Sequence, residues 1–309
     1  MYTSFFTHSA CLGHDTGEGH PECSERLRAV LAAFDTEEFY LLDRREAPRA
    51  TMEQLTRVHP QEHVEKLLEP VAEGTHRAVD DDTYMSSGTA EAALRAAGAV
   101  VAAVDLVASG EARNAFCAVR PPGHHAERIK AMGFCFFNNA AIGAYHARAV
   151  HGLNRIAVVD FDVHHGNGTQ DIFQNDAAML YCSTHQAPLY PHTGDIKETG
   201  LFNNIVNAPL PAMAGSPEFR DVMTRSILPA IDHFKPDMII ISAGFDAHSR
   251  DPLANLHLTD DDFVWATRKI GELARTHCGA RIVSVLEGGY NLRALASASA
   301  AHVRELMYC

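Results

Sequence analysis

Residues 156–168 read IAVVDFDVHHGNG, an apolar run that passes directly into a cluster of acidic residues, histidines and glycines. The run at 156–161 predicts a strand that is covered on both faces, because it is apolar and β-branched without alternation. Similar short runs occur at 115–119, 179–183, 238–242 and 282–286. These strands would form the centre of the fold.

Helical patterns separate the strands, for example at 89–108, which is rich in alanine, and at 138–150. Two later helices carry start signals, since Ser216 precedes Pro217 and Thr259 with Asp262 resembles a capping box. Strands and helices in alternation predict right-handed crossovers and a parallel sheet. With no repeat, linker or composition break, we expect a single three-layer α/β domain over residues 1–309, with long loops at 187–200 and 207–216.

Composition narrows the classes of partner. The formal net charge of −13 argues against nucleic acid and would suit basic partners such as lysine-rich peptides, although it could equally serve solubility alone. The seven cysteines are scattered and contain no C-x-x-C pair, which argues against a disulfide framework or a cysteine zinc site. No stretch approaches the roughly 20 apolar residues of a membrane span. We expect a cytoplasmic protein without a membrane partner, and a homo-oligomer remains possible.

Four polar clusters each follow directly after a predicted strand. They are RPPGHHA (120–126), DFDVHHGNG (160–168), SAGFDAH (242–248) and LEGGYN (286–291). In an open parallel sheet the carboxyl ends of the strands share one edge, so residues from these clusters should meet in space. The sequence therefore predicts one functional site at this edge.

A metal site is the first expectation for this edge. Asp160, Asp162 and His164 alternate, so an extended backbone would direct all three to one face. Asp246 supplies a third ligand beside Asp162 and His164, and three protein ligands with an open position are typical of catalytic zinc, although Fe(II) or Co(II) would also fit. His248 is a rival ligand, with a hydrogen bond within its loop as the favoured alternative. Any one of these residues alone could instead cap a helix.

The tandem histidines His124 and His125 follow a turn rich in proline and suit general base and acid duty. Metal ligation or loop packing is the alternative for one of them. Each needs an orienting partner, for which Asp160 is a candidate beside His124 and Asn167 beside His125. Tyr290 follows two glycines and could donate to a developing oxyanion, or simply pack on the sheet.

The motifs resemble those of the histone deacetylases in the arginase/deacetylase superfamily, and most closely the class II-like and bacterial amidohydrolase branch. The resemblance covers nearly the whole chain, because GHPECSERL, RPPGHHA, GFCFFNNAAIGA, VDFDVHHGNGTQDIF, YPHTGD, SAGFDAHSRDPLANL and LEGGYNL occur in family order. It implies one deacetylase domain with a mainly parallel, eight-stranded sheet between helical layers.

The resemblance also implies residue roles. Zinc (Zn²⁺) would be held by Asp162, His164 and Asp246, with His124 and His125 as the catalytic pair and Tyr290 as the transition-state donor. The other implied positions are a substrate channel at Gly133, Phe134, Tyr190 and Leu253, and an acetate-release cavity at Arg26. Structural potassium (K⁺) would be held by Asp160, Asp162, His164, Ser183 and Thr184, and at a second site through the backbone of Phe173, Asp176 and Met179.

Departures from family patterns refine the expectation. Asn167 stands where class I enzymes carry an acid, which favours the class II-like branch. Gly166 and His248 disfavour a two-metal ureohydrolase, and Leu253 replaces the acid of acetylpolyamine hydrolases. We therefore expect a zinc-dependent amidohydrolase that deacylates lysine side chains in proteins or peptides. Hydrolysis of an acetylpolyamine or another small acetylated amine is the main alternative, and an inactive acyl-lysine binding protein is a further one.

Overall fold

The apolar strands form the centre of one parallel sheet. The computed structural model describes residues 2–309, and its main sheet has the strand order β2-β1-β5-β10-β9-β6-β7-β8. Every pairing in this sheet is parallel. The strands are β1 (Tyr2–Thr7), β2 (Asp43–Glu46), β5 (Ala112–Cys117), β6 (Ile156–Asp160), β7 (Met179–Gln186), β8 (Ile205–Leu210), β9 (Met238–Ala243) and β10 (Ile282–Leu286). The predicted α/β fold with a mainly parallel eight-stranded sheet is confirmed.

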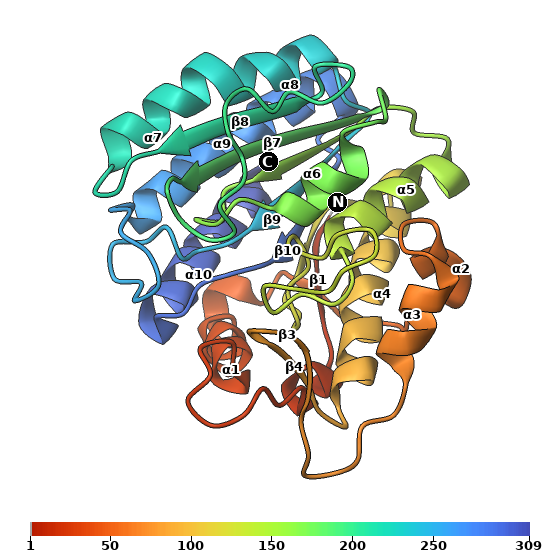
Figure 1. Cartoon of the computed structure of the whole chain (residues 1–309). Coiled ribbons are helices and arrows are strands. Elements are labelled where there is room, and N and C mark those ends of the chain that lie inside the picture. The colour runs from red at the N-terminus through yellow and green to blue at the C-terminus, as the bar shows by residue number, and fades with distance from the viewer. Residues whose placement is uncertain (1) are drawn as a thin grey trace.

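Helices cover both faces of the sheet, as Figure 1 shows. On one face α4 packs against α5, and on the other α1 packs against α10, which in turn packs against α9. The helices are α1 (Ser24–Ala33), α2 (Met52–Thr56), α3 (Gln61–Leu68), α4 (Thr89–Ser109), α5 (Asn139–His151), α6 (Asn167–Phe173), α7 (Ser216–Val222), α8 (Leu228–Phe234), α9 (Asp260–Cys278) and α10 (Leu292–Tyr308). The three predicted layers are present.

Local signals explain where the predicted helices begin and end. The Asn138 side chain accepts a hydrogen bond from the backbone of Ala141 and caps α5, and Thr259 forms the expected capping box before α9. Helix α4 ends at Gly110, whose φ of 79° is the left-handed conformation that glycine adopts readily. The predicted boundaries at 89–108 and 138–150 therefore differ from the observed ones by a single residue at each altered end.

Three strands of the main sheet escaped the sequence analysis. Strand β1 has only the apolar pair Phe5 and Phe6 at its centre, and β2 reads DRRE, which has no apolar pattern. Strand β8 covers the first part of the loop that was expected at 207–216, so that prediction was wrong for residues 207–210. Pro209 is tolerated in β8 because this strand is at the edge of the sheet, where a missing N–H costs no pairing on the open side.

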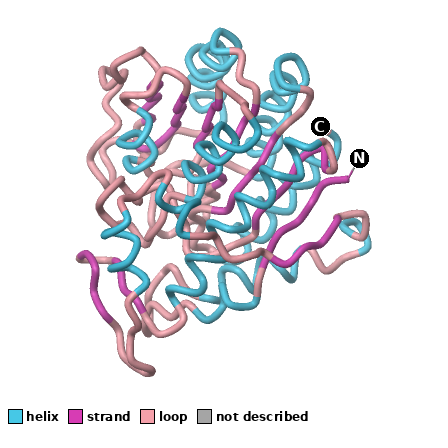
Figure 2. The backbone as a smooth tube through the Cα atoms, turned by 90° about the vertical axis from the view of Figure 1, so that its right-hand side faces the viewer, coloured by secondary structure: helices cyan, strands magenta, loops and turns pink. Residues whose placement is uncertain are grey.

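A separate antiparallel hairpin, β3 (Arg77–Asp80) and β4 (Thr83–Met85), projects away from the main sheet in Figure 2. The acidic residues Asp81 and Asp82 form its turn. The expectation that no stretch of the chain approaches a membrane span needs correction, because α4 is long and apolar enough, by length and composition, to cross a membrane. Its apolar window is 61% buried inside the structure, and α4 covers the sheet as a core helix does.

Candidate active site

The four polar clusters meet because they follow neighbouring strands. Strands β5, β10, β9 and β6 are adjacent at the centre of the sheet, and the clusters begin at or just after their carboxyl ends. Residues that are more than 160 positions apart in the chain, such as Gly123 and Glu287, are hydrogen-bonded to each other there. The expected convergence at one edge of the sheet is present.

An imidazole and two carboxylates lie together at this edge. His164 Nδ1 lies 3.1 Å from Asp162 Oδ1 and 3.1 Å from Asp246 Oδ2, and one ligand atom from each residue lies within 4.8 Å of the others. The expected extended backbone through His164 is not observed, because β6 ends at Asp160. A bend after the strand, and not strand alternation, brings Asp162 and His164 to one point.

The electrostatics of this cluster favour a cation. Burial and the neighbouring Asp162 raise the pKa of Asp246 to about 7. Burial opposes a charge on His164, but hydrogen bonds to Asp162 and Asp246 raise its pKa to about 10. Two carboxylates and an imidazole that converge in a buried place are a donor set suited to a divalent cation such as zinc. The residues present therefore fit the expected metal.

Two glycines, Gly288 and Gly244, let the backbone pack directly against the carboxylates of Asp162 and Asp246. Gly288 N donates a hydrogen bond to Asp162 Oδ2 at 2.8 Å. A Cβ at Gly288 would lie 2.2 Å from Asp246 Oδ2, and one at Gly244 would lie 2.0 Å from Asp162 Oδ2. These two glycines are needed because the backbone approaches the carboxylates more closely than any side chain allows.

A second group with metal-ligand spacing lies between α4 and α5, and it is better explained by hydrogen bonds. His146 Nε2 and His151 Nε2 lie 2.7 and 2.6 Å from Asp105 Oδ1. Arg57 Nη1 donates to His146 Nδ1 at 2.7 Å. Because an arginine only donates, His146 carries its hydrogen on Nε2 and offers no lone pair to a metal there.

The tandem histidines have the partners expected from the sequence. His124 Nδ1 lies 2.9 Å from Asp160 Oδ2, and His125 Nδ1 lies 2.8 Å from Asn167 Oδ1. Burial opposes a charge on His124, but Asp162 and Asp160 outweigh it and raise its pKa. Burial, together with the neighbouring His124, lowers the pKa of His125. The two neighbouring imidazoles therefore have pKa values shifted in opposite directions.

Two buried residues that the sequence analysis overlooked support the pair. Glu287 Oε2 accepts the backbone N–H groups of Gly123 and His124 at 2.7 and 3.1 Å. Burial raises the pKa of Glu287 to about 7 although His124 opposes the shift. Tyr181 donates from its hydroxyl to Asp160 Oδ2 at 3.0 Å. An acidic residue at the end of an apolar strand was the available signal for Glu287.

Tyr290 is held from two sides. Asp251 Oδ2 accepts the Tyr290 backbone N–H at 2.7 Å, and the Arg26 guanidinium lies 4.8 Å from the centre of the Tyr290 ring. Burial raises the pKa of the Tyr290 phenol, although Arg26 opposes the shift. The hydroxyl therefore stays protonated and can donate a hydrogen bond. Asp251 was not among the expected site residues.

A cavity of about 270 Å³ opens onto this cluster. It is lined by Asp82, His125, Gly133, Phe134, His164, Leu189, Tyr190, Leu253 and Tyr290. The four channel residues expected from the resemblance are all in its wall. In the hairpin turn, Asp82 Oδ1 accepts the Gly133 backbone N–H at 3.2 Å, so this acidic residue supports the wall.

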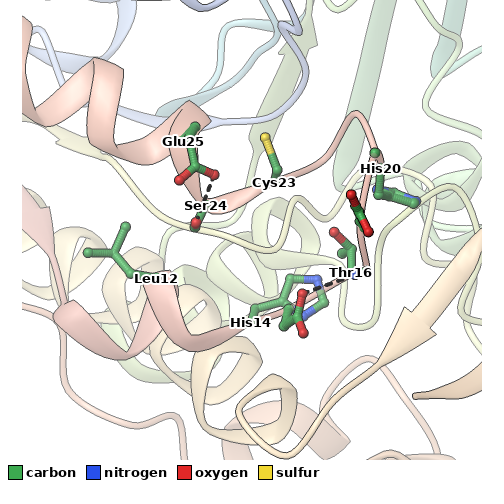
Figure 3. A pocket seen from close by; sticks show the side chains of 11 residues that line it. Leu12, His14, Thr16, His20, Cys23, Ser24 and Glu25 are labelled. Carbon is green, nitrogen blue, oxygen red and sulfur yellow. Dashed lines mark hydrogen bonds between the residues drawn. The ribbon is translucent and has the colours of Figure 1, made fainter. Parts of the chain in front are cut away.

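A larger polar cavity of about 480 Å³ is formed by the loop at 12–25 (Figure 3). His20 lines this cavity, and its ring centre lies 4.7 Å from that of Phe134, which lines the channel. His248, the rival ligand, accepts a hydrogen bond from the backbone of Arg250 at its Nδ1. The metal-spaced group around Asp246 contains Asp162 and His164 and not His248.

Arg26 belongs to a fully buried ionic network. Its guanidinium donates to Glu22 Oε1 at 2.8 Å and to the backbone oxygens of Glu287 and Gly289. Glu22 also receives two hydrogen bonds from Arg120. Although burial favours a neutral Glu22, Arg120 and Arg26 outweigh it and hold its pKa at about 2. Arg26 thus holds the loop that carries Tyr290, and its role toward acetate stays a prediction.

Two potassium sites are expected from the resemblance, and the structure argues against the second of them. Asp160, Asp162 and His164 lie at the edge described above, and Ser183 and Thr184 are in the neighbouring strand β7, where Ser183 Oγ lies 2.9 Å from His185 Nδ1. At the second site the backbone oxygens of Phe173, Asp176 and Met179 converge on one atom. That atom is Asn204 Nδ2, at 2.8, 3.2 and 2.9 Å respectively. A side-chain amide occupies the centre that the ion would need, so these residues do not fit a cation there.

Comparisons with known proteins agree with this architecture. The model of the Histone deacetylase domain family matches residues 20–306. Histone deacetylase 14, chloroplastic, of Arabidopsis thaliana is 41% identical over 97% of this chain and 75% of its own length. The Histone deacetylase-like amidohydrolase of Pseudomonas aeruginosa is 37% identical over 94% of this chain and 82% of its own. The crystal structure of the HDA15 HD domain superposes with a TM-score of 0.93 at 34% identity and covers 99% of this chain and 88% of that one.

The chain belongs to the histone deacetylase family, as the resemblance predicted. It is a hydrolase of that family, whose relatives include proteins named as deacetylases and an amidohydrolase.

Proposed function

We propose that this protein is a zinc-dependent amidohydrolase that removes acyl groups from lysine side chains of proteins or peptides. One observation carries the proposal. A three-residue donor set, a histidine pair of unequal pKa and a tyrosine lie together, and one member of each, His164, His125 and Tyr290, lines the same cavity. Each alone has a structural explanation, but together they provide every group that amide hydrolysis by activated water requires.

The metal ligands in this proposal are Asp162, His164 and Asp246. A bound zinc ion supplies Lewis-acid chemistry, since it polarises the acyl carbonyl and lowers the pKa of water. The protein fixes the donors through Gly288 N on Asp162 Oδ2 and through Val163 N, which donates to Asp246 Oδ1 at 2.8 Å. These contacts leave one oxygen of each carboxylate facing His164.

His125 is the proton carrier in this proposal. It lines the cavity and is neutral because its pKa is lowered, so its Nε2 can accept a proton from the attacking water. The protonated His125 then returns a proton to the departing lysine amine. His124 stays cationic beside Asp160 and stabilises the negative charge that develops on the acyl oxygen, together with the hydroxyl of Tyr290.

An acyl-lysine is the substrate class that this cavity suits best. Phe134 and Tyr190 offer aromatic surface to four methylene groups. Leu253 lies in the wall and is 36% exposed, where an acid would be needed to attract a second amine of a polyamine. The proposed substrate therefore has an apolar stem and no second cation near Leu253.

A substrate panel tests the proposal. The purified protein, loaded with zinc, is assayed for kcat/KM on an acetyl-lysine peptide and on acetylspermidine, with and without a chelator. We expect chelator-sensitive hydrolysis with a preference for the peptide. A large preference for acetylspermidine would make the protein a polyamine deacetylase, and no hydrolysis of either by the metal-loaded protein would leave an acyl-lysine binding protein.

A further inference from the structure

We infer that Glu127 is a positioning residue that fixes the orientation of the Asn167 amide and, through it, the tautomer of His125. The inference deepens the proposed function, on which it rests, by assigning the group that makes His125 able to accept a proton. Neither the sequence motifs nor the expected site residues gave Glu127 a role.

The contacts form a chain of three side chains. Asn167 is the first residue of α6 and is 6% exposed. Its Nδ2 donates to Glu127 Oε1 at 2.8 Å, and its Oδ1 lies 2.8 Å from His125 Nδ1. Among the described residues, the other polar neighbour of Nδ2 is Met132 Sδ at 3.4 Å, which is also an acceptor. The Glu127 backbone N–H donates to Lys130 O at 2.9 Å and holds the loop in place.

Glu127 fixes the donor and acceptor roles of Asn167, and Asn167 in turn fixes those of His125. An ionised carboxylate only accepts hydrogen bonds, so Glu127 requires the NH₂ end of Asn167. The oxygen of the amide must then face His125, and because that oxygen only accepts, His125 carries its hydrogen on Nδ1. In a neutral imidazole the lone pair is therefore on Nε2, the atom that must accept the proton from water.

An asparagine without such an anchor would be an ambiguous partner. If the amide turned over, its NH₂ would donate to His125 Nδ1 and force the hydrogen onto Nε2. In serine protease triads, replacing the orienting aspartate by asparagine costs about 10⁴-fold in kcat for this reason. Glu127 removes the ambiguity here, since turning the amide would set the Asn167 oxygen against a carboxylate.

Kinetics of charge-altered variants test the role. Glu127→Gln keeps an oxygen that accepts from Asn167 and serves as the conservative variant, whereas Glu127→Lys can only donate and would turn the amide. We expect Glu127→Lys to lower kcat by about 10- to 100-fold, the range for losing a partner that orients a metal-site histidine. KM, zinc content and thermal unfolding should stay close to those of the wild type, and Glu127→Gln should retain most of kcat.

The same substitution in a second background separates orientation from a general structural effect. In Asn167→Asp the partner of His125 accepts from either oxygen, and Glu127 becomes a like charge beside it. Glu127→Lys should therefore raise kcat in the Asn167→Asp background, while it lowers kcat in the wild type. An effect of the same sign and size in both backgrounds would overturn the inference.

Nuclear magnetic resonance gives a readout that does not depend on turnover. In the zinc-loaded protein labelled with ¹⁵N-histidine, the His125 signals are assigned from the spectrum of His125→Gln. We expect the Nδ1–H tautomer in the wild type and a shift toward Nε2–H in Glu127→Lys. An Nε2–H tautomer in the wild type, or an unchanged tautomer in Glu127→Lys, would overturn the role of Glu127. Both results are readable even if the protein hydrolyses no acyl-lysine, so failure of this inference is distinct from failure of the proposed function.

Discussion

Gly288→Ala should weaken metal binding although it alters no ligand. The new Cβ would lie 2.2 Å from Asp246 Oδ2 and 2.5 Å from Asp162 Oδ2. Ordinary contact begins at 3.4 Å, so the Asp246 carboxylate must retreat by about 1.2 Å or the loop must move by as much. Partners of metal ligands are worth about 10- to 100-fold in affinity, and a displacement of 1 Å can cost about 100-fold in rate.

Zinc affinity by competition with a chromogenic chelator is the assay, followed by kcat at saturating zinc. We expect the affinity to fall by about 10- to 100-fold and the residual kcat to fall by about 100-fold. Gly13→Ala is the matched control, because a Cβ there meets nothing within 4 Å and the backbone is not left-handed. A Gly288→Ala protein with the affinity and turnover of the wild type would refute the argument that the backbone at Gly288 fixes the carboxylates.

Three further outcomes are expected. Tyr290→Phe should lower kcat by about 10²- to 10³-fold with zinc content intact, and turnover equal to wild type would rule out its hydroxyl as the oxyanion donor. Asn204→Asp places a carboxylate among three carbonyl oxygens, so K⁺ should raise the thermal stability of this variant above its value in matched tetramethylammonium. The rise should be larger than in the wild type, and equal rises would contradict the conclusion that the Asn204 amide takes the place of an ion. Burial lowers the pKa of His302 from 6.5 to about 3. Below pH 6.5 the unfolded chain therefore binds a proton at this histidine that the folded protein does not bind. The free energy of unfolding then falls as the pH drops, by up to about 1.4 kcal/mol per pH unit from this group. Urea unfolding at pH 7 and pH 5 should show a smaller loss in His302→Gln than in the wild type, and identical losses would contradict this assignment.

The central strands and the place of the site could be predicted because they depend on local pattern. An apolar run such as 282–286 is a buried strand wherever it occurs in a parallel sheet, and the observed β10 has the same bounds. Strand β2 could not be found in this way, since DRRE has no apolar residue and pairs only because β1 lies beside it. Strand β8 was hidden by Pro209, which local rules assign to a loop.

Within the site, the residues that follow strand ends were predictable and their supports were not. The alternation at Asp162 and His164 suggested a metal, yet a bend after the strand brings them together. Glu22 and Arg120 are 98 positions apart in the chain, so no spacing rule reveals that they pair. Asp251 holds Tyr290 across 39 positions in the same way. Such buried partners depend on how loops from different strands pack together.

The measurement that bears most directly on the proposed chemistry is anomalous scattering at the zinc edge from crystals of the zinc-loaded protein. We expect one strong peak between Asp162, His164 and Asp246, and its loss in Asp246→Ala together with the hydrolysis of acetyl-lysine. A wild-type crystal with zinc elsewhere and nothing between these three side chains, from protein that hydrolyses acetyl-lysine, would contradict the account.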